Sequence, residues 1–342
     1  MSILHVLQRI KTEIDQTHPG LGRLAAFTLI ATRARKCLLV ISPSGFGKSA
    51  SSESIAELYP QRLRRIDAAS MASLSKRETE LNGFNGLVVV DDLTKAQTTY
   101  SKVATISTLA ELTYSHFVDR SMGNQRVNIE DFHAATIINI QPVWFKEIAT
   151  APEWDAVVRE KCIRYYHLIR PTKPNTAVPR LTKISNHDVD RVKANSPSEQ
   201  LYSQIDDIAS SQWSDARINE HVPMLLKATA SLDGRSNVND QDAKILIELM
   251  RPMTLERYVL RSLGFETDRE YDSNALYVYA ELATSRKANI KAVQRNYKFS
   301  KSQAYRIIQN LSNLVYLSPK RSGKLIPTKQ TKQVLKEAGY YG

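Results

Sequence analysis

A glycine-containing loop between an apolar run and a polar helical segment constrains the fold of this chain more than any other feature. Residues 37–41 (CLLVI) form a continuous apolar run that predicts a buried parallel strand. The loop that follows, residues 42–49 (SPSGFGKS), leads into a segment with helical character. Strand, glycine loop and helix in this order are typical of a P-loop, whose backbone N–H groups point at a phosphate.

The same loop supplies the side chains that a bound nucleotide needs. Lys48 is expected to reach the β- and γ-phosphates, and the Ser49 hydroxyl to ligate Mg²⁺. The usual motif begins with glycine where Ser42 stands, and serine fits there if its φ angle is negative. The predicted nucleotide-binding residues are Ser44, Gly45, Phe46, Gly47, Lys48, Ser49 and Ala50.

A second apolar run ends in paired carboxylates. Residues 87–90 (LVVV) predict another buried strand, and Asp91 and Asp92 follow it. This pattern is typical of a Walker B strand, in which one carboxylate holds Mg²⁺ and the next orients or activates the attacking water. We therefore assign Asp91 to the metal and Asp92 to catalysis. The usual second residue is glutamate, and Asp92 is one methylene shorter.

With both motifs in this order, the chain resembles the AAA+ ATPases. Residues 136–139 (TIIN) resemble the sensor 1 strand of that family, whose polar residue, here Asn139, helps to hold the attacking water. In this family an arginine of one subunit completes the site of its neighbour. The resemblance gives this role to Arg159, with Arg164 as the alternative. It implies a homo-oligomer, ring-shaped or helical, that uses ATP and Mg²⁺.

The order of helical and strand patterns divides the chain into three parts. Helices and apolar strands alternate over residues 1–172, as in an α/β nucleotide-binding core with a parallel sheet. Residues 171–179, rich in Pro, Thr and Asn, predict a linker. Residues 180–265 are expected to form a small all-α lid, whose last helix covers Thr254–Leu263. Residues 272–342 form the third part.

A Gly-Arg turn within residues 232–242 resembles a turn found in several AAA+ lids. In that interpretation Arg235 is a sensor 2 arginine that contacts the γ-phosphate and belongs to the nucleotide site. A surface arginine near a helix cap explains the same residues, so both readings stay open.

The positive charge of the chain is concentrated in its last part. The whole chain carries a net charge of +12. Residues 274–342 hold thirteen lysines and arginines against two glutamates, a net charge of +11. A local basic block of this kind favours a phosphate-rich partner, with a solvated basic surface as the plainer alternative.

The same residues predict a winged helix-turn-helix. Helices are expected at Asn274–Thr284, Ile290–Tyr297 and from Lys301 to about Leu314, followed by a basic β-hairpin. In that fold the third helix enters the DNA major groove and the wing follows the backbone. A protein-docking role for such a domain stays open. The predicted DNA-binding residues are Lys301, Gln303 and Arg306 on the helix and Lys320, Arg321 and Lys324 on the wing.

The order of core, lid and winged helix resembles RuvB branch-migration motors, archaeal origin-recognition ATPases and, more distantly, MCM helicases. It implies a DNA-dependent ATPase that remodels, loads onto or moves along duplex DNA, in replication initiation or helicase loading. One alternative is an ATP-gated DNA-binding regulator of a plasmid, virus or transposon, with slow hydrolysis. Another is an AAA+ machine that remodels proteins.

The sequence also bears on where the protein works. No apolar run reaches the length of a membrane-spanning helix, and residues 1–11 lack the apolar region of a signal peptide. Cys37 and Cys162 are expected to be buried thiols of a reducing compartment. The cytoplasm, with no membrane partner, is the expected location.

Overall fold

A computed structural model describes residues 5–58, 63–67, 69–91, 93, 98–122, 125–151, 154–171, 184–185, 187–262, 269–285, 287–319 and 323–341. Three of the predicted site residues, Asp92, Lys320 and Arg321, lie outside the described residues. So does nearly all of the expected linker.

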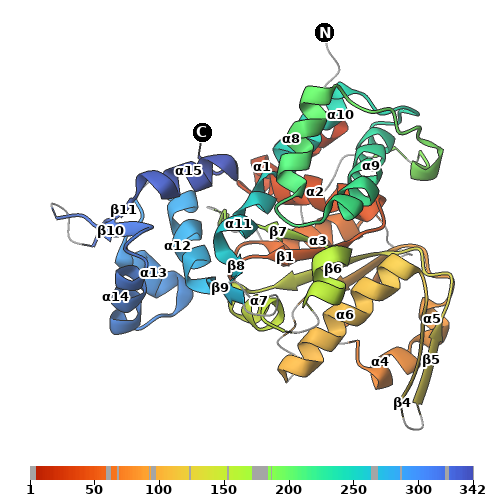
Figure 1. Ribbon diagram of the computed structural model, residues 1–342, viewed down its shortest axis with the longest axis horizontal. Helices are drawn as coiled ribbons and strands as arrows, with labels where there is room; N and C mark the ends of the chain where they lie inside the picture. The colour runs from red at the N-terminus through yellow and green to blue at the C-terminus, as the bar shows by residue number, and fades with distance from the viewer. Residues whose placement is uncertain are drawn as a thin grey trace.

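A five-stranded parallel sheet forms the centre of the molecule (Figure 1). Its strands are β1 Cys37–Ile41, β2 Leu63–Arg65, β3 Leu87–Val90, β6 Ala135–Ile140 and β7 Cys162–Tyr166, in the order β2-β3-β6-β1-β7. Four of the five are buried on both faces, which explains their continuous apolar sequences. Because β6 lies between β1 and β3, the segments that follow these three strands meet at one edge of the sheet.

Alternate residues of β1 enter two different cores, one on each face of the sheet. Leu38 and Val40 join one core with α1 Val6–Thr17, α2 Gly22–Arg33 and the helices of residues 199–250. Leu39 and Ile41 join the opposite core with α6 Thr99–Ser115 and α7 Pro142–Ala149. The C-terminal helices belong to this second core. The sheet therefore lies between the lid region on one face and α6, α7 and the C-terminal region on the other.

The edge of the core next to β2 carries elements that the sequence patterns did not indicate. They are the short helices α4 Met71–Ser75 and α5 Glu78–Leu81 and the antiparallel hairpin of β4 Val118–Met122 and β5 Gln125–Ile129. Figure 1 shows this hairpin extending beyond α6 at the border of the molecule. A π-helix at Trp154–Arg159 precedes β7.

The lid region is helical up to residue 259. It contains α8 Glu199–Ala209, α9 Asp215–Leu232, α10 Asp240–Met250, a 3₁₀ helix at Arg251–Leu255 and α11 Glu256–Val259. The prediction of a helix over Thr254–Leu263 is wrong at its end, because Leu260–Ser262 forms β8 and pairs with β9 Arg269–Tyr271. Since α9 and α10 share a core with α1 and α2, the lid region packs firmly on the sheet domain.

The C-terminal region contains three helices and a two-stranded ribbon. These are α12 Ser273–Thr284, α13 Ile290–Tyr297 and α14 Lys301–Asn310, then β10 Val315–Leu317 paired antiparallel with β11 Leu325–Pro327. Lys298 adopts a left-handed conformation, with φ of 58°, in the turn between α13 and α14. Helix α14 is shorter than expected and ends at Asn310. A last helix, α15 Lys329–Glu337, was not expected.

In the part of the chain that the structure describes, no helix is long and apolar enough to span a bilayer.

Candidate nucleotide-binding site

The loop between β1 and α3 Lys48–Ala56 has the backbone of a phosphate-binding turn. Gly45 and Gly47 have φ angles of +78° and +83°, a left-handed conformation that side-chain-bearing residues adopt at a cost. Ser42 is not among the described residues with positive φ, which meets the condition set for a serine at that position. Its backbone N–H donates to the carbonyl of Ile140 on the neighbouring strand, at 3.1 Å. The loop is therefore fixed to the sheet where it begins.

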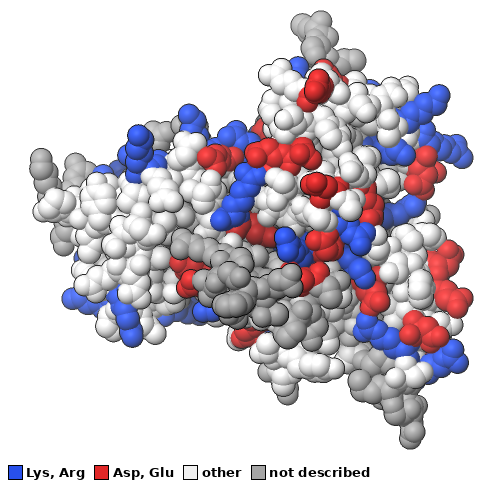
Figure 2. All heavy atoms as spheres, in the orientation of Figure 1, with Lys and Arg blue, Asp and Glu red and all other residues white. Residues whose placement is uncertain are grey.

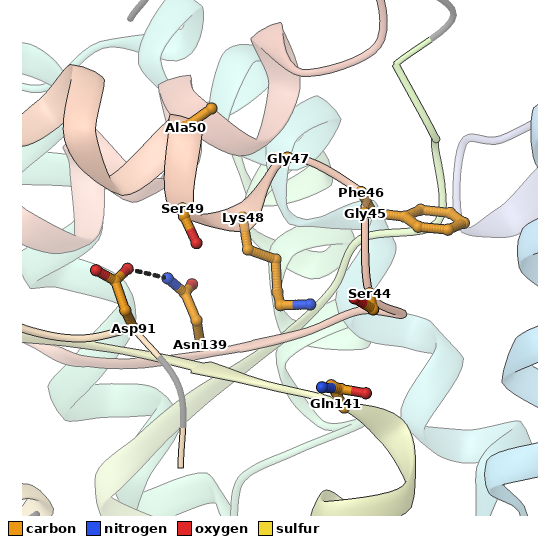
Figure 3. A pocket seen from close by; sticks show the side chains of 10 residues that line it. All are labelled: Ser44, Gly45, Phe46, Gly47, Lys48, Ser49, Ala50, Asp91, Asn139 and Gln141. Carbon is orange, nitrogen blue, oxygen red and sulfur yellow. Dashed lines mark hydrogen bonds between the residues drawn. The ribbon is translucent and has the colours of Figure 1, made fainter. Parts of the chain in front are cut away.

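The ammonium group of Lys48 lies inside the loop. Its Nζ donates to the carbonyl oxygens of Ser42, at 2.6 Å, and Pro43, at 2.9 Å. In Figure 3 the side chain runs from the start of α3 back across the pocket toward Ser44. This position puts one positive charge beside the first backbone N–H groups of α3, so both attract an anion to the same place.

Asp91 and Asn139 meet across the ends of β3 and β6. The Asn139 Nδ2 donates to Asp91 Oδ1, at 3.3 Å (Figure 3). It also donates to the hydroxyl of Ser52 in α3, at 3.1 Å. Asn139 is only 1% exposed, and its Oδ1 has no hydrogen-bond partner among the described residues. The other oxygen of Asp91 accepts from Arg65 on β2, at 3.0 Å. A buried amide oxygen without a partner is unfavourable and favours a ligand or a water in this pocket.

One cavity of about 250 Å³ brings the predicted residues together. It is lined by Ser44, Gly45, Phe46, Gly47, Lys48, Ser49, Ala50, Asp91, Asn139 and Gln141. All seven predicted loop residues are in this set, as are the predicted metal partner and the sensor 1 asparagine. Asp92, the predicted water-activating residue, lies outside the described residues.

Gln141 is a pocket residue that the sequence interpretation missed. It stands two residues after Asn139 and is the N-cap of α7. In Figure 3 it lies across the pocket from the loop that carries Ser44. The signal was available, because residues two apart at the end of a strand lie on the same face. The loop-and-carboxylate motif did not include it.

A buried histidine, His167, is hydrogen-bonded to the backbone of the phosphate-binding loop. The Nε2–H of His167 donates to the carbonyl of Phe46, at 3.1 Å. Burial, together with the charge of Lys48, lowers the pKa of His167 to about 3. The ring is therefore neutral at physiological pH, and it fixes the loop without adding charge.

The two candidates for the arginine that completes a neighbouring site differ in exposure. Arg159 is half exposed and pairs with Asp155 on its own helical turn, at 3.4 Å. Arg164 is fully buried and pairs with Glu256 of α11, with Nη2 to Oε1 at 2.8 Å. Because Arg164 is buried and paired, it is not presented to a second subunit in this structure, which therefore does not support the alternative assignment to Arg164.

Arg235 does not line the pocket. Its Nη1 donates to Asp242, at 2.8 Å, and its Nε to Asp233, at 3.1 Å. Both carboxylates belong to the same turn that carries the arginine, and Asp242 also completes the capping box of α10. The γ-phosphate contact predicted for Arg235 is therefore not supported by this structure, because two nearer carboxylates hold the guanidinium. The helix-cap reading fits instead.

The predicted DNA-binding face of α14 is exposed. Lys301, Gln303, Tyr305, Arg306 and Gln309 face outward, while Ile308 is buried. Gln303 has a second task, because its Oε1 accepts from the backbone of Ser300, at 2.8 Å, in a capping box. Bidentate recognition of adenine needs that oxygen, so Gln303 can read a base only if it gives up its capping role.

A basic groove lies beside this face. It has a volume of about 650 Å³ between α13, the start of α14 and β11, and Lys287, Lys291, Lys301 and Lys324 line it. In Figure 2 basic side chains lie along the upper and lower borders of the C-terminal region, whereas acidic ones gather over the middle of the molecule.

No protein family matches the sequence, and no curated protein does either. Among solved structures, the chain is similar to a protein from Cytophaga hutchinsonii named a "putative ATPase". The TM-score is 0.44 and the sequence identity 14%, over 70% of this chain and 84% of that chain. A likeness of this degree says nothing about function, and the function proposed below rests on the residues of the pocket.

The pocket suits a nucleoside triphosphate with Mg²⁺. The loop N–H groups and Lys48 would hold the phosphates, and Ser49 and Asp91 offer the oxygen ligands that Mg²⁺ prefers. Asn139, whose Oδ1 is buried and unpartnered among the described residues, lines the same pocket. Mg²⁺ would neutralise charge on the phosphate oxygens. What this chain itself supplies is a positive cradle, a carboxylate and two amides, Asn139 and Gln141, able to orient a water.

Proposed function

We propose that this chain is an ATPase of AAA+ type that binds duplex DNA through a C-terminal winged helix and couples ATP hydrolysis to remodelling, loading onto or movement along DNA. The observation that carries the proposal is the pocket, in which Lys48, Asp91 and Asn139 meet from three separate elements. These three polar residues are distant in the sequence, yet they line one cavity at the N-terminus of α3, which is the arrangement that a bound phosphate requires.

The C-terminal region supports the second half of the proposal. Its helices and ribbon follow one another in winged-helix order, with α14 as the recognition helix. Lys301 and Arg306 on the helix and Lys324 directly before the second ribbon strand would contact phosphates, and Lys301 and Lys324 also line the basic groove. Its surplus of charge favours nucleic acid over a protein partner.

The proposal includes assembly of several copies of this chain into a homo-oligomer. Arg159 is exposed and held loosely by Asp155, so it is available to a neighbouring subunit of a ring or helix. In this proposal a homo-oligomer completes each nucleotide site. Replication initiation or helicase loading is the setting that we favour.

One observation favours a slower, switch-like variant of this function. The C-terminal end is tied to the core by Arg23, which donates to the carbonyls of Ala338, at 3.3 Å, and Gly339, at 2.8 Å. Arg251 likewise donates to the carbonyl of Glu337, at 2.9 Å. A DNA-binding domain fixed in this way suits an ATP-gated regulator, which needs binding and release but little turnover.

Two measurements on the purified full chain test the proposal. The first is ATP hydrolysis with Mg²⁺, which Lys48→Ala should abolish and the exposed-lysine control Lys146→Ala should leave intact. Absence of hydrolysis and of ATP binding by the unaltered protein would end the proposal. Tight ATP binding with turnover below about one per minute would select the switch.

The second measurement is the salt dependence of binding to a duplex oligonucleotide. Combined replacement of Lys301, Arg306 and Lys324 by alanine should flatten the slope of log K against log salt by roughly two to three, since each lost phosphate contact contributes about 0.9. Replacing Lys146, Lys193 and Lys244 removes the same charge elsewhere and serves as control. Equal slopes for both triple variants would exclude the winged helix from the DNA interface.

A further inference from the structure

The side chain of one P-loop residue leaves the nucleotide pocket and enters the C-terminal domain. Phe46 is 1% exposed and belongs to the core shared with the C-terminal helices. In Figure 3 its ring points away from Lys48. It stacks on Tyr297, with ring centroids 6.5 Å apart and 23° between the planes. A loop residue that needed only to leave room for phosphate would not require a large aromatic side chain.

An arginine completes the contact. The guanidinium carbon of Arg170 lies 4.9 Å from the Phe46 ring centre and 5.8 Å from that of Tyr297. Its Nε is buried and has no hydrogen-bond partner among the described residues, and the guanidinium lies against the two rings. The backbone N–H of Arg170 donates to Thr284 of α12, at 3.1 Å, which fixes this segment to the C-terminal domain. Contacts between arginine and aromatic faces are favourable, more so when desolvated.

Tyr297 connects this cluster to the proposed recognition helix. It is the last residue of α13, and the left-handed Lys298 and the N-cap Ser300 of α14 follow it directly. Its ring also contacts Tyr277 of α12, with centroids 4.8 Å apart. A displacement of Phe46 would therefore be felt at the turn that sets the direction of α14.

We propose that Tyr297 and Arg170 are positioning residues for the P-loop, and that through Phe46 they couple nucleotide binding to DNA binding by α14. This inference rests on the proposed function of the two sites. Coupling of binding equilibria is reciprocal, so DNA bound to α14 changes the affinity for ATP by the same factor as ATP changes the affinity for DNA.

The chain offers a matched pair of variants. The hydroxyl of Tyr297 is buried and makes no hydrogen bond among the described residues, so Tyr297→Phe removes that hydroxyl and keeps the ring. Tyr297→Leu removes the ring and keeps an apolar side chain. Phe46→Leu and Arg170→Gln break the same cluster from its other members, and they decide the question if Tyr297→Leu does not fold.

The readout is the dissociation constant of a fluorescent ATP analogue on the full chain, with circular dichroism as the check of folding. We expect Tyr297→Leu, Phe46→Leu and Arg170→Gln to weaken nucleotide binding roughly 5-fold or more, within the usual range of coupling. Tyr297→Phe should stay within about 2-fold of the unaltered protein. Folded ring-deleted variants with unaltered nucleotide affinity would overturn the inference.

The second readout separates positioning from general stability. The ratio of duplex DNA affinities with and without the ATP analogue should differ from one in the unaltered protein and in Tyr297→Phe, and should approach one in Tyr297→Leu. If the unaltered protein binds ATP and DNA but the ratio survives in Tyr297→Leu, only the coupling inference fails. If the unaltered protein binds no nucleotide, the proposed function fails with it.

Discussion

At the scale of single residues, Asn139 connects more parts of the nucleotide site than the sensor 1 motif suggests. Its amide nitrogen donates to Asp91 and Ser52, so Asn139 fixes the carboxylate from one side, and the residue also lines the pocket. Such a residue affects the chemical step more than the binding of the nucleotide, because the loop and Lys48 hold the phosphates without it.

We therefore expect Asn139→Ala to lower kcat for ATP hydrolysis by about 100-fold, the effect of losing one well-placed group, with the dissociation constant of ATP changed by less than about 3-fold. Steady-state hydrolysis and equilibrium binding check this. Asn195→Ala, at an exposed lid position, serves as control. Weakened binding with normal kcat would show that Asn139 holds the ground state instead.

His167 makes a prediction about pH. Its pKa is about 3 in the folded chain because of burial and the nearby Lys48, and about 6.5 when unfolded. Between these two pKa values the unfolded chain binds a proton at His167 and the folded chain does not. The contribution of His167 to the free energy of unfolding is complete above about pH 6.5. It falls as the pH drops toward 3, by up to about 1.4 kcal/mol per pH unit.

Replacement by glutamine keeps a donor for the Phe46 carbonyl and removes the titration. In His167→Gln the free energy of unfolding should decline less between pH 7 and pH 5 than in the unaltered protein, as measured by urea denaturation. Some decline should remain, because burial lowers the pKa of His221 to about 4 as well. Identical pH slopes in the two proteins would refute the role of His167.

At the scale of elements, a buried ion pair joins the sheet to the lid region. Arg164 of β7 contacts both carboxylate oxygens of Glu256, and the hydroxyl of Tyr166 donates to the same carboxylate, at 3.0 Å. The carbonyl of Gln212 accepts from Arg164, at 2.6 Å. The guanidinium is thus fully buried with hydrogen-bond partners on several sides.

Removal of one partner would leave a buried charge unpaired. Glu256→Ala should lower the free energy of unfolding by about 3–5 kcal/mol. Glu256→Gln, which keeps the size and an acceptor, should cost less, and Asp207→Ala on the exposed face of α8 should cost under about 1 kcal/mol. Chemical denaturation measures all three, and a loss from Glu256→Ala no larger than that from Asp207→Ala would contradict this account.

Periodicity and motif spacing gave most of the elements and most of the pocket. The buried strands and the loop after β1 were predictable because apolar runs and a glycine turn are local signals. The hairpin of β4 and β5 was not, since Arg120 and Arg126 interrupt its apolar pattern. Helix α15 was not predicted because its sequence is polar on average, although Thr331, Val334 and Leu335 form a buried face.

Other features of the candidate sites depend on side-chain contacts that the motifs do not encode. Arg235 was assigned to a phosphate because its motif could not show that Asp233 and Asp242 would hold it. The base-reading role predicted for Gln303 is untested, and the structure adds a capping role that depends on the local geometry of the helix start. Cys37 and Cys162 are buried thiols as expected, and the strand order, which the sequence did not show, brings their sulfur atoms to 3.5 Å.

At the scale of the whole molecule, the position of the C-terminal domain changes what the nucleotide site means. Sequence patterns describe a core, a lid and a basic tail in succession. The structure packs the tail into the same core as the P-loop residue Phe46, so the nucleotide site lies against the C-terminal helices. Nothing in a single sequence reports such a contact between residues so far apart.

The most direct test of this account is the rate of ATP hydrolysis at saturating ATP and Mg²⁺, measured as duplex DNA is added. The unaltered protein should show a change of severalfold, and the triple variant of Lys301, Arg306 and Lys324 should keep its basal rate without that change. Lys48→Ala should hydrolyse no ATP under either condition. A rate that stays constant while DNA is demonstrably bound would contradict the coupling of the two sites.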